Sequence, residues 1–381
     1  MSTPNRVALL TSFIAPYRTA VFKDLERRCK EFEIFVLRPV EADRAWSVDW
    51  EDLPVRQQRS LMVPGTWRHP HGFSESQPIH LPYDTIPQLI RFDPDVILAD
   101  ELGLRTLQAA VYRAIGRRTR LVVWAKLSEV TEQGRGRFRL FLRRVLLQLA
   151  DAVIVNGGSG ARYVKNLGVK ADKVFRVPQT TDVASFLAIP SERAPAVRHR
   201  LLYCGRLVQL KGLVPFLSNL AEFARQRPNQ PIEVWFAGDG PLRSDLTQFP
   251  LPANLALTFL GDVPYDRLPE VYSQAGILIF PTLADEWGLV VVEAMAAGLP
   301  VLGSLHSQAV EDLLTDGLDG WTFRPDDCAG LRSALNRAFG APAEEIDRMG
   351  QHARNRVRDL TPESMSQQMM AAVEYAYAQN S

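Results

Sequence analysis

Short apolar runs recur in two series along the chain and are separated by longer stretches with helical periodicity. Runs of this length, joined by helices, are typical of buried parallel strands in α/β domains. In the first series the runs lie at 7–11, 32–37, 95–99, 121–124 and 152–155. In the second series they lie at 200–204, 232–237, 255–259, 277–280, 300–302 and 320–323. The sequence therefore predicts an α/β protein with two Rossmann-like, doubly wound parallel sheets.

A segment at about 187–200, which carries Pro190 and Pro195, separates the two series. The chain has 381 residues, enough for two domains that each bury a core. We expect a first domain at 1–187 and a second at 188–361. Residues 362–381 follow the second series and are expected to be mainly helical.

Composition excludes several classes of protein. The net charge is +1, which gives no sign of nucleic-acid binding. The three cysteines, Cys29, Cys204 and Cys328, are far apart and form neither a disulfide framework nor a zinc pattern. No signal peptide and no run of 18 apolar residues is visible. We expect a cytoplasmic protein without a membrane span.

The segment from Asp285 to Pro300 points most directly to a ligand site. It follows the predicted strand 277–280, and Gly288 and Gly298 bracket a short helix. The backbone N–H groups of Trp287, Gly288, Leu289 and Val290 would lie at this helix N-terminus, beyond the carboxyl end of a strand. Open α/β sheets bind ligands there, and the helix dipole favours phosphate.

A second acid, Glu293, lies eight residues after Asp285 on an otherwise apolar helix. A buried carboxylate needs a polar partner, and a ribose diol would be a suitable one. The alternative is an acid paired with a neighbouring side chain.

These residues resemble the acid-x7-acid signature of retaining, nucleotide-sugar-dependent glycosyltransferases of family 4, which have the GT-B fold. Tyr203-Cys204-Gly205-Arg206-Leu207 through Lys211-Gly212 resembles the family's diphosphate clamp. Ala237-Gly238-Asp239-Gly240-Pro241-Leu242 resembles its Gly-x-Gly-Pro turn, and Leu260-Gly261-Asp262-Val263 is similar to its loop beside the nucleotide base. The resemblance covers roughly 201–323, whereas the first half matches in outline.

The resemblance implies a role for each matched residue. Arg206 and Lys211 would neutralise the leaving diphosphate, and Glu293 would bind both ribose hydroxyls. Asp285 would contact the donor sugar, but the family usually has Glu there, and Asp is shorter by ~1.5 Å. Glu286 could take that role, and Asp285 could instead cap the helix. Gly205, Gly238 and Gly240 would lie near the donor, although a plain structural turn also explains the last two, and Val263 would press on the base.

The implied activity is a retaining, metal-independent transfer of a hexose from a UDP- or GDP-sugar, with UDP preferred. The acceptor would be a glycan or a lipid-linked molecule, in polysaccharide or cell-surface glycan synthesis. No cofactor and no protein nucleophile are expected. GT-B enzymes also have a cleft between their domains and a C-terminal helix, here within 362–381, that crosses back to the first domain. The alternatives are transfer to a small soluble acceptor, an epimerase, or a non-catalytic nucleotide-sugar-binding protein.

The first half departs from the family pattern. Its first loop, Thr11 to Arg18, has no Gly, and the segment after Trp124 has no His. Tyr17, Arg18, Lys126 and Glu129 still follow predicted strands, so we expect them on the acceptor side. We interpret His69, His71 and His80 as surface or acceptor-loop residues, and Asp93-Pro94-Asp95 as a loop, because neither pattern has metal-ligand spacing.

Residues 135–144 form a basic amphipathic segment. Five arginines alternate with large apolar residues: Arg135, Arg137, Arg139, Arg143 and Arg144. Such a helix favours contact with anionic lipid, and an ordinary solvated helix is the alternative.

Overall fold

The structure is a computed structural model that describes residues 4–38, 50, 52–68, 72–76, 79–115, 118–190 and 193–379. The chain divides into two compact units, residues 1–181 with 362–381, and residues 182–361. The first unit thus ends before the predicted residue 187. Residues 182–187 belong to the second unit because α6 (Ala184–Leu187) packs on α10 (Leu289–Ala296).

The first unit is built on a seven-stranded sheet with the order β11-β10-β9-β8-β1-β2-β3. All of its neighbouring strands are parallel. The strands are β1 (Arg6–Thr11), β2 (Glu31–Val36), β3 (Val55–Gln57), β8 (Val96–Ala99), β9 (Arg120–Ala125), β10 (Ala152–Val155) and β11 (Val174–Arg176). The strand order reverses between β1 and β8, so the loops that follow these two strands meet at a topological switch point.

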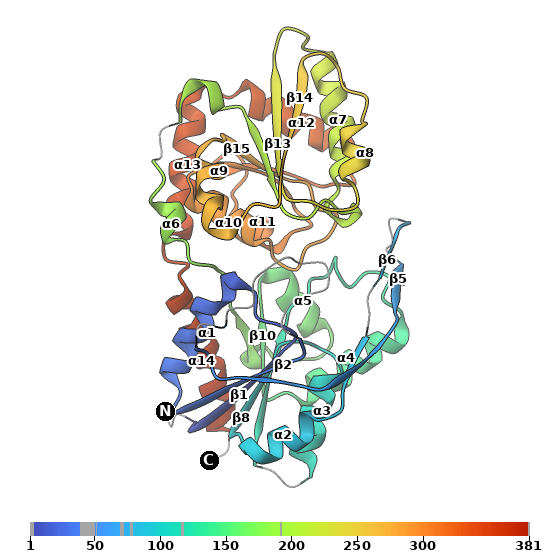
Figure 1. Cartoon of the computed structure of the whole chain (residues 1–381), viewed down its shortest axis with the longest axis vertical. Coiled ribbons are helices and arrows are strands. Elements are labelled where there is room, and N and C mark those ends of the chain that lie inside the picture. The colour runs from blue at the N-terminus through green and yellow to red at the C-terminus, as the bar shows by residue number, and fades with distance from the viewer. Residues whose placement is uncertain are drawn as a thin grey trace. The chain divides into compact units, whose positions relative to one another are not determined.

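Helices cover both faces of this sheet (Figure 1). On one face lie α1 (Pro16–Arg28) and α14 (Pro362–Ala378), which pack against each other. On the other face lie α2 (Thr85–Phe92), α3 (Leu104–Ala114), α4 (Arg137–Leu149) and α5 (Gly158–Asn166). The C-terminal helix is therefore part of the first unit, where the Ser366 hydroxyl contacts the Asp24 carboxylate of α1.

Two small antiparallel pairs lie outside the first sheet. β4 (Ser60–Val63) pairs with β7 (Ile79–Pro82), and β5 (Thr66–Arg68) pairs with β6 (Ser74–Ser76). This part of the chain has weak hydrophobic periodicity, so the bounds of these short strands could not be predicted.

The second unit has a six-stranded parallel sheet with the order β14-β13-β12-β15-β16-β17. Its strands are β12 (Leu201–Cys204), β13 (Ile232–Ala237), β14 (Leu255–Gly261), β15 (Ile277–Phe280), β16 (Val301–Ser304) and β17 (Gly320–Phe323). The other helices are α7 (Leu213–Arg225), α8 (Arg243–Thr247), α9 (Leu268–Ser273), α11 (Gln308–Leu313), α12 (Cys328–Gly340) and α13 (Ala343–Val357). Short 3-10 turns of this unit are η2 (Pro195–Val197), η3 (Gln209–Lys211) and η4 (Tyr265–Arg267), and η1 (Ala171–Lys173) belongs to the first unit.

Two apolar clusters enclose the second sheet, one that includes α7 and α12 and another that includes α9, α10 and α11. The strand order reverses between β12 and β15. The loops after these strands, 205–212 and 281–288, therefore lie side by side at the carboxyl edge, where ligands bind in such sheets.

Candidate functional site

The loops after β12 and β15 are in direct contact. The N–H of Leu283 donates to the carbonyl of Leu210 at 2.9 Å. Gly212 has φ +65°, and a Cβ at this position would lie 2.3 Å from the carbonyl oxygen of Pro281. Only glycine allows this approach without moving the backbone. The two segments that carry most of the predicted donor-binding residues thus form one surface.

The turn after β13 packs on the first of these loops. The Gly205 N–H donates to the Ala237 carbonyl at 2.9 Å. A Cβ on Gly238 would approach the Gly205 oxygen to 2.1 Å, and one on Gly240 would approach the Leu207 oxygen to 2.6 Å. The close packing of these backbones thus requires glycine at 238 and 240 whether or not a ligand binds there. Contact of Gly238 and Gly240 with a ligand stays a prediction.

Asp285 joins two elements of the site. One carboxylate oxygen, Oδ2, forms an ion pair with Lys211 Nζ, and the other, Oδ1, accepts the N–H of Trp287 at 3.1 Å. Its own N–H donates to the carbonyl of His306 at 3.0 Å. Asp285 therefore stabilises the turn before α10 and holds the Lys211 ammonium at the carboxyl edge, but it does not cap the helix, whose N-cap is Gly288.

The neighbouring Glu286 is exposed, and its backbone carbonyl accepts Gln308 Nε2 at 2.6 Å. Trp287 does not present the backbone N–H donor to a ligand that the sequence predicted. Its N–H is used by Asp285, its carbonyl accepts the Ala309 N–H at 3.0 Å, and its ring is buried in the core. We therefore reassign Trp287 from ligand contact to support of the turn.

The first turn of α10 still presents backbone donors. Gly288 precedes the helix with φ +111°, and Leu289 and Val290 are its first two residues. N–H groups in the first turn of a helix have no acceptor within the helix. They and the positive end of the helix dipole favour an anion at this position.

Glu293 lies deeper on the same helix and is only 4% exposed. Its Oε2 accepts the hydroxyl of Tyr272, on α9, at 2.9 Å. Burial raises the pKa of Glu293 to about 7, and the hydrogen bond from Tyr272 acts in the opposite direction. Cys204, at the end of β12, lies next to this pair, and burial raises the pKa of its thiol to about 12.

Tyr272 was not found from the sequence because it lies outside the recognisable motifs. Tyr272 and Glu293 are 21 positions apart, and only the fold brings α9 and α10 together so that the two side chains meet. Val263 is half-buried after β14, and its contact with the base stays a prediction. Nearby, the N–H of Gly238 donates to the Gly261 carbonyl at 2.7 Å.

Two of the four predicted acceptor-side residues come together in the first unit. Arg18 Nη1 lies 3.2 Å from Asp100 Oδ2, and Lys126 Nζ lies 2.7 Å from Asp100 Oδ1. Asp100 is buried at the end of β8, beside the switch point. Arg18 also donates to Gln179 at 3.1 Å, a contact that the sequence did not indicate. The cluster holds two cations and one carboxylate at the carboxyl edge of the first sheet.

The other two residues are placed differently. Tyr17 lies beside Arg18, whose guanidinium carbon is 5.9 Å from the ring centroid. Glu129 does not join the cluster, because its carboxylate pairs with Arg162 at 2.9 Å. The sequence placed these residues on the same sheet edge but could not assign their partners.

The sequence raised His69, His71, His80 and Asp93-Pro94-Asp95 as possible metal ligands. Of these, His69 and His71 lie outside the described residues. His80 is half-buried on β7, and burial lowers its pKa. Asp95 Oδ2 accepts the backbone N–H groups of Asn5 and Arg6 at 2.7 and 3.0 Å. Within the part of the chain that the structure describes, no cluster of three or more His, Cys, Asp or Glu is suited to a metal.

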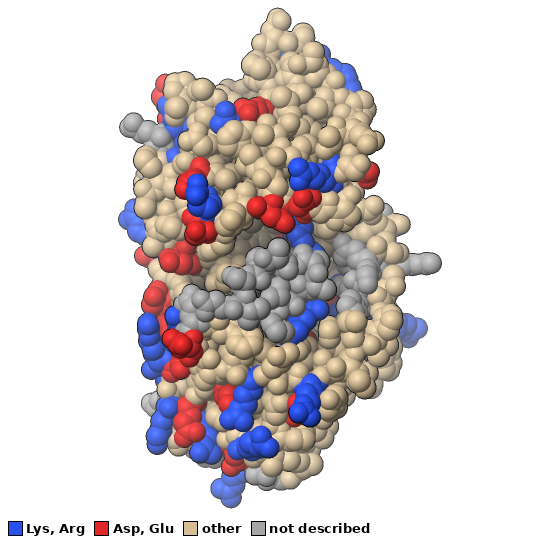
Figure 2. Space-filling view, in the orientation of Figure 1, with Lys and Arg blue, Asp and Glu red and all other residues tan. Residues whose placement is uncertain are grey.

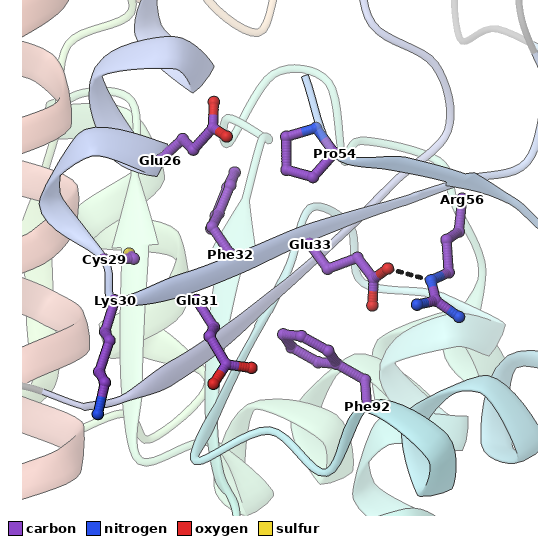
Figure 3. A pocket seen from close by; sticks show the side chains of 9 residues that line it. All are labelled: Glu26, Cys29, Lys30, Glu31, Phe32, Glu33, Pro54, Arg56 and Phe92. Atoms are coloured by element: carbon purple, nitrogen blue, oxygen red, sulfur yellow. Dashed lines mark hydrogen bonds and ion pairs between the residues drawn. The ribbon is translucent and has the colours of Figure 1, made fainter. Parts of the chain in front are cut away.

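A separate hollow of about 400 Å³ lies on the first unit (Figure 3). It is lined by the end of α1, the start of β2 and the Glu33–Arg56 ion pair. It opens near the amino ends of β2 and β3, the edge opposite the one where parallel α/β sheets bind ligands. We therefore do not place the predicted glycosyl transfer in this hollow.

The predicted basic helix is α4, and two of the five arginines differ from expectation. Arg135 lies before the helix, is half-buried and donates to the Thr131 carbonyl at 3.1 Å. Arg143 is buried and forms an ion pair with Glu132, so it is not available at the surface. Arg137, Arg139 and Arg144 are exposed. No helix among the described residues is long and apolar enough to cross a membrane.

Comparison with known proteins shows the family of the chain. Residues 198–340 match the family model "Glycosyl transferases group 1", and residues 14–180 match "Glycosyl transferase 4-like domain". The chain is 29% identical to a D-inositol 3-phosphate glycosyltransferase of Nocardia farcinica, over 54% of this chain and 48% of that protein. It is 24% identical to the sulfoquinovosyl transferase SQD2 of Arabidopsis thaliana, over 86% of this chain and 65% of that protein. The matches thus span about half to two thirds of these relatives.

Solved structures show the same fold. HepE of Anabaena, in complex with UDP and glucose, superposes with a TM-score of 0.70 at 16% identity, and the match covers 97% of this chain and 99% of that one. Two family models, one on each half, and a fold shared over nearly the whole length lead to one conclusion. The chain belongs to the group 1 glycosyltransferases, with a family-4-like first half and the GT-B fold.

Proposed function

We propose that this glycosyltransferase is a retaining, metal-independent enzyme that moves a hexose from a nucleoside-diphosphate sugar to a glycan or lipid-linked acceptor. The proposal includes a preference for UDP over GDP and a role in polysaccharide or cell-surface glycan synthesis. The contact between the loops after β12 and β15 is the observation that carries it. That contact places Lys211 against Asp285, beside the first turn of α10.

This arrangement suits a nucleoside diphosphate. Lys211 and Arg206 supply positive charge for the leaving diphosphate, and the first turn of α10 adds N–H donors. Glu293 lies on the same helix and accepts the ribose hydroxyls. The UDP-bound structure of HepE, which shares the fold, supports UDP as the first donor to test.

Transfer with retention needs no protein nucleophile in this proposal. The acceptor oxygen attacks the anomeric carbon from the face that the diphosphate leaves, and the bond between that carbon and the phosphate oxygen breaks. The departing phosphate takes the proton of the acceptor hydroxyl. Arg206 and Lys211 then stabilise the negative charge that develops on the diphosphate.

The acceptor is assigned to the first unit, at the cluster of Arg18, Lys126 and Asp100. Because Asp100 holds both cations, they are fixed in place before a ligand arrives, which lowers the entropic cost of binding. Tyr17 flanks the cluster, and Glu129, with its own ion pair, has a peripheral role. We place the enzyme in the cytoplasm, where its three free thiols would stay reduced, with membrane contact through 135–144.

A panel of UDP-, GDP-, ADP- and TDP-sugars tests the donor assignment through thermal stabilisation. A donor present at 100 times its Kd stabilises the folded state by about 2.7 kcal/mol. We expect UDP-sugars to raise the melting temperature most. Slow hydrolysis of the bound sugar nucleotide would then separate an enzyme from a protein that only binds it.

Asp285→Asn is expected to reduce sugar transfer more than it weakens UDP binding. The carboxylate holds Lys211 and the N-terminal turn of α10, and an amide loses the ion pair but keeps an oxygen for the Trp287 N–H. Transfer rates and calorimetric UDP affinity are measured on the same samples. Glu286→Ala is the matched neighbour. If Glu286→Ala abolishes transfer and Asp285→Asn does not, the exposed Glu286 is the residue that contacts the sugar.

Activity is expected to survive EDTA. The leaving diphosphate is neutralised by Arg206 and Lys211 in this proposal, so Mg²⁺ has no required role. Initial rates are measured after dialysis against EDTA and again after adding Mn²⁺ or Mg²⁺. Complete loss of activity that a divalent metal restores would contradict the cationic clamp.

A further inference from the structure

Exposed apolar side chains are concentrated in one part of the first unit. Fourteen of the sixteen exposed large hydrophobic residues in the described chain lie between residues 61 and 149. They are Leu61, Met62, Val63, Ile79, Tyr83, Ile90, Leu107, Val111, Ile115, Phe138, Leu140, Phe141, Val145 and Leu149. Single exposed apolar residues are normal, but a concentration of this kind marks an interaction surface.

These side chains form stripes on neighbouring elements. Leu107, Val111 and Ile115 recur every four residues along α3 and its C-terminal end, so they share one side of that helix. Phe138 and Phe141, three residues apart, begin a similar stripe on α4. The helices α2, α3 and α4 pack in sequence on one face of the sheet.

Hydrogen bonds hold these elements together. Arg113 of α3 donates to the Leu149 carbonyl of α4 at 2.9 Å, and Gln108 of α3 donates to the Pro82 carbonyl of β7 at 2.6 Å. We call the outer surface of α2, α3, α4 and the β4–β7 pair the α2–α4 face.

The helices of this face carry charge of one sign, whereas the residues that flank α2, Asp84 and Asp93, are acidic. The helices α2, α3 and α4 contain no Asp or Glu, whereas Arg91, Arg137, Arg139 and Arg144 are exposed on them. The nearby acids Glu132 and Asp151 have arginine partners, Arg143 for the first and Arg113 for the second. In Figure 2 the surface over α3 and α4 is mostly uncharged, and the charged side chains near it are mainly basic.

Phe138 and Phe141, 79% and 64% exposed, argue against a simply solvated helix. Large rings beside arginines suit the boundary between lipid head groups and acyl chains, where the rings enter the apolar layer and the guanidinium groups meet phosphate. A protein partner would require acidic groups opposite the same arginines. An anionic bilayer supplies a continuous negative surface and an apolar layer together.

We propose that the α2–α4 face docks on a membrane that contains anionic lipid, with the first turns of α4 entering the interface. This deepens the proposed function, because a docked enzyme can reach a lipid-linked acceptor. It extends the contact from 135–144 to α2, α3 and the β4–β7 pair, and it excludes the buried Arg143 from the lipid-contacting residues.

Co-sedimentation with vesicles tests the docking. Wild-type protein is mixed at low salt with vesicles of phosphatidylcholine alone and of phosphatidylcholine with phosphatidylglycerol. Binding is expected only to the second kind and is expected to fall as salt rises. Because an arginine near an anionic surface contributes about 1 kcal/mol, the triple variant Arg137→Gln/Arg139→Gln/Arg144→Gln should bind about a hundredfold more weakly. Phe138→Ser/Phe141→Ser should also lose binding.

Matched changes on the second unit serve as controls. Arg225→Gln/Arg332→Gln/Arg348→Gln removes the same charge from exposed positions, and Val214→Ser/Leu318→Ser removes exposed apolar groups. Both control proteins should sediment like the wild type. A Leu107→Ser/Val111→Ser variant tests the extension to α3, and retention of full binding by this variant would restrict the contact to α4.

The outcomes are distinct. If the protein stays in the supernatant with phosphatidylglycerol vesicles, or if all variants bind equally, the proposal is wrong. If sedimentation velocity instead shows a dimer that Phe138→Ser/Phe141→Ser dissociates, the face is a protein interface. Thermal stabilisation by UDP is measured on every variant. UDP binding without vesicle binding would refute the docking and leave the glycosyltransferase proposal standing.

Discussion

Arg206→Ala and Lys211→Ala should each lower turnover by about 10² to 10³, the loss typical of removing one preorganised electrostatic donor. Neither change should unfold the protein, because both side chains lie in the loop after β12 and outside the apolar clusters. Turnover is measured with saturating UDP-sugar, and folding is measured by thermal melting. Arg225→Ala, in an exposed ion pair of α7, is the control for loss of one charge.

The ion pair with Asp285 makes Lys211 the more informative of the two. In Lys211→Ala the Asp285 carboxylate loses its cationic partner and places an uncompensated negative charge beside the diphosphate. The double variant Lys211→Ala/Asp285→Asn removes that charge and should recover part of the lost affinity for UDP. Near-wild-type turnover in both single variants would refute the diphosphate assignment.

The strands could be predicted closely because their sequences carry local signals. The run 232–237 coincides with β13, and 152–155 coincides with β10. The run 152–155 is apolar and buried at every position, as in a sheet covered on both faces, whereas in 232–237 Glu233 and Trp235 on one face are half-buried. The loops around the candidate site were also located, because glycines mark the points where one backbone must approach another. Gly212 and Gly238 lie at such points.

The partners of the charged residues could not be predicted, because they come from distant parts of the chain. Lys211 and Asp285 are 74 positions apart, and Glu293 meets Tyr272 only when α9 packs on α10. Amphipathic periodicity likewise placed Arg143 among the exposed arginines of α4. Its burial depends on Glu132, which lies before the helix and has no signal in the periodic pattern.

UDP affinity should depend on pH near neutrality, and Glu293→Gln should remove that dependence. Burial raises the pKa of Glu293 to about 7, so a large fraction of the free protein carries the neutral carboxyl at physiological pH. A carboxylate accepts two ribose hydroxyls, whereas the neutral acid has one oxygen occupied by its proton. Binding therefore requires loss of that proton, and affinity should fall about tenfold per pH unit below 7.

The same group gives a stability effect of known sign. The pKa of Glu293 is 4.5 in an unfolded chain and about 7 in the folded protein, so folding favours the protonated carboxyl. Its stabilising contribution is complete below pH 4.5 and is lost as pH rises through 7. The shift corresponds to roughly 3 kcal/mol. Glu293→Gln keeps a neutral side chain at every pH, so this variant should melt higher than the wild type at pH 8.5.

Calorimetric titration with UDP at pH 6, 7 and 8, in buffers that differ in ionisation enthalpy, measures both affinity and proton release. Wild-type protein should release close to one proton at pH 6 and little at pH 8, and Glu293→Gln should bind weakly with no proton release. Tyr272→Phe removes the hydrogen bond that lowers the pKa of Glu293, so the midpoint should move to higher pH. Unchanged UDP affinity in Glu293→Gln, together with the predicted rise in melting temperature, would show a buried acid that is paired with Tyr272 and has no role in ribose binding.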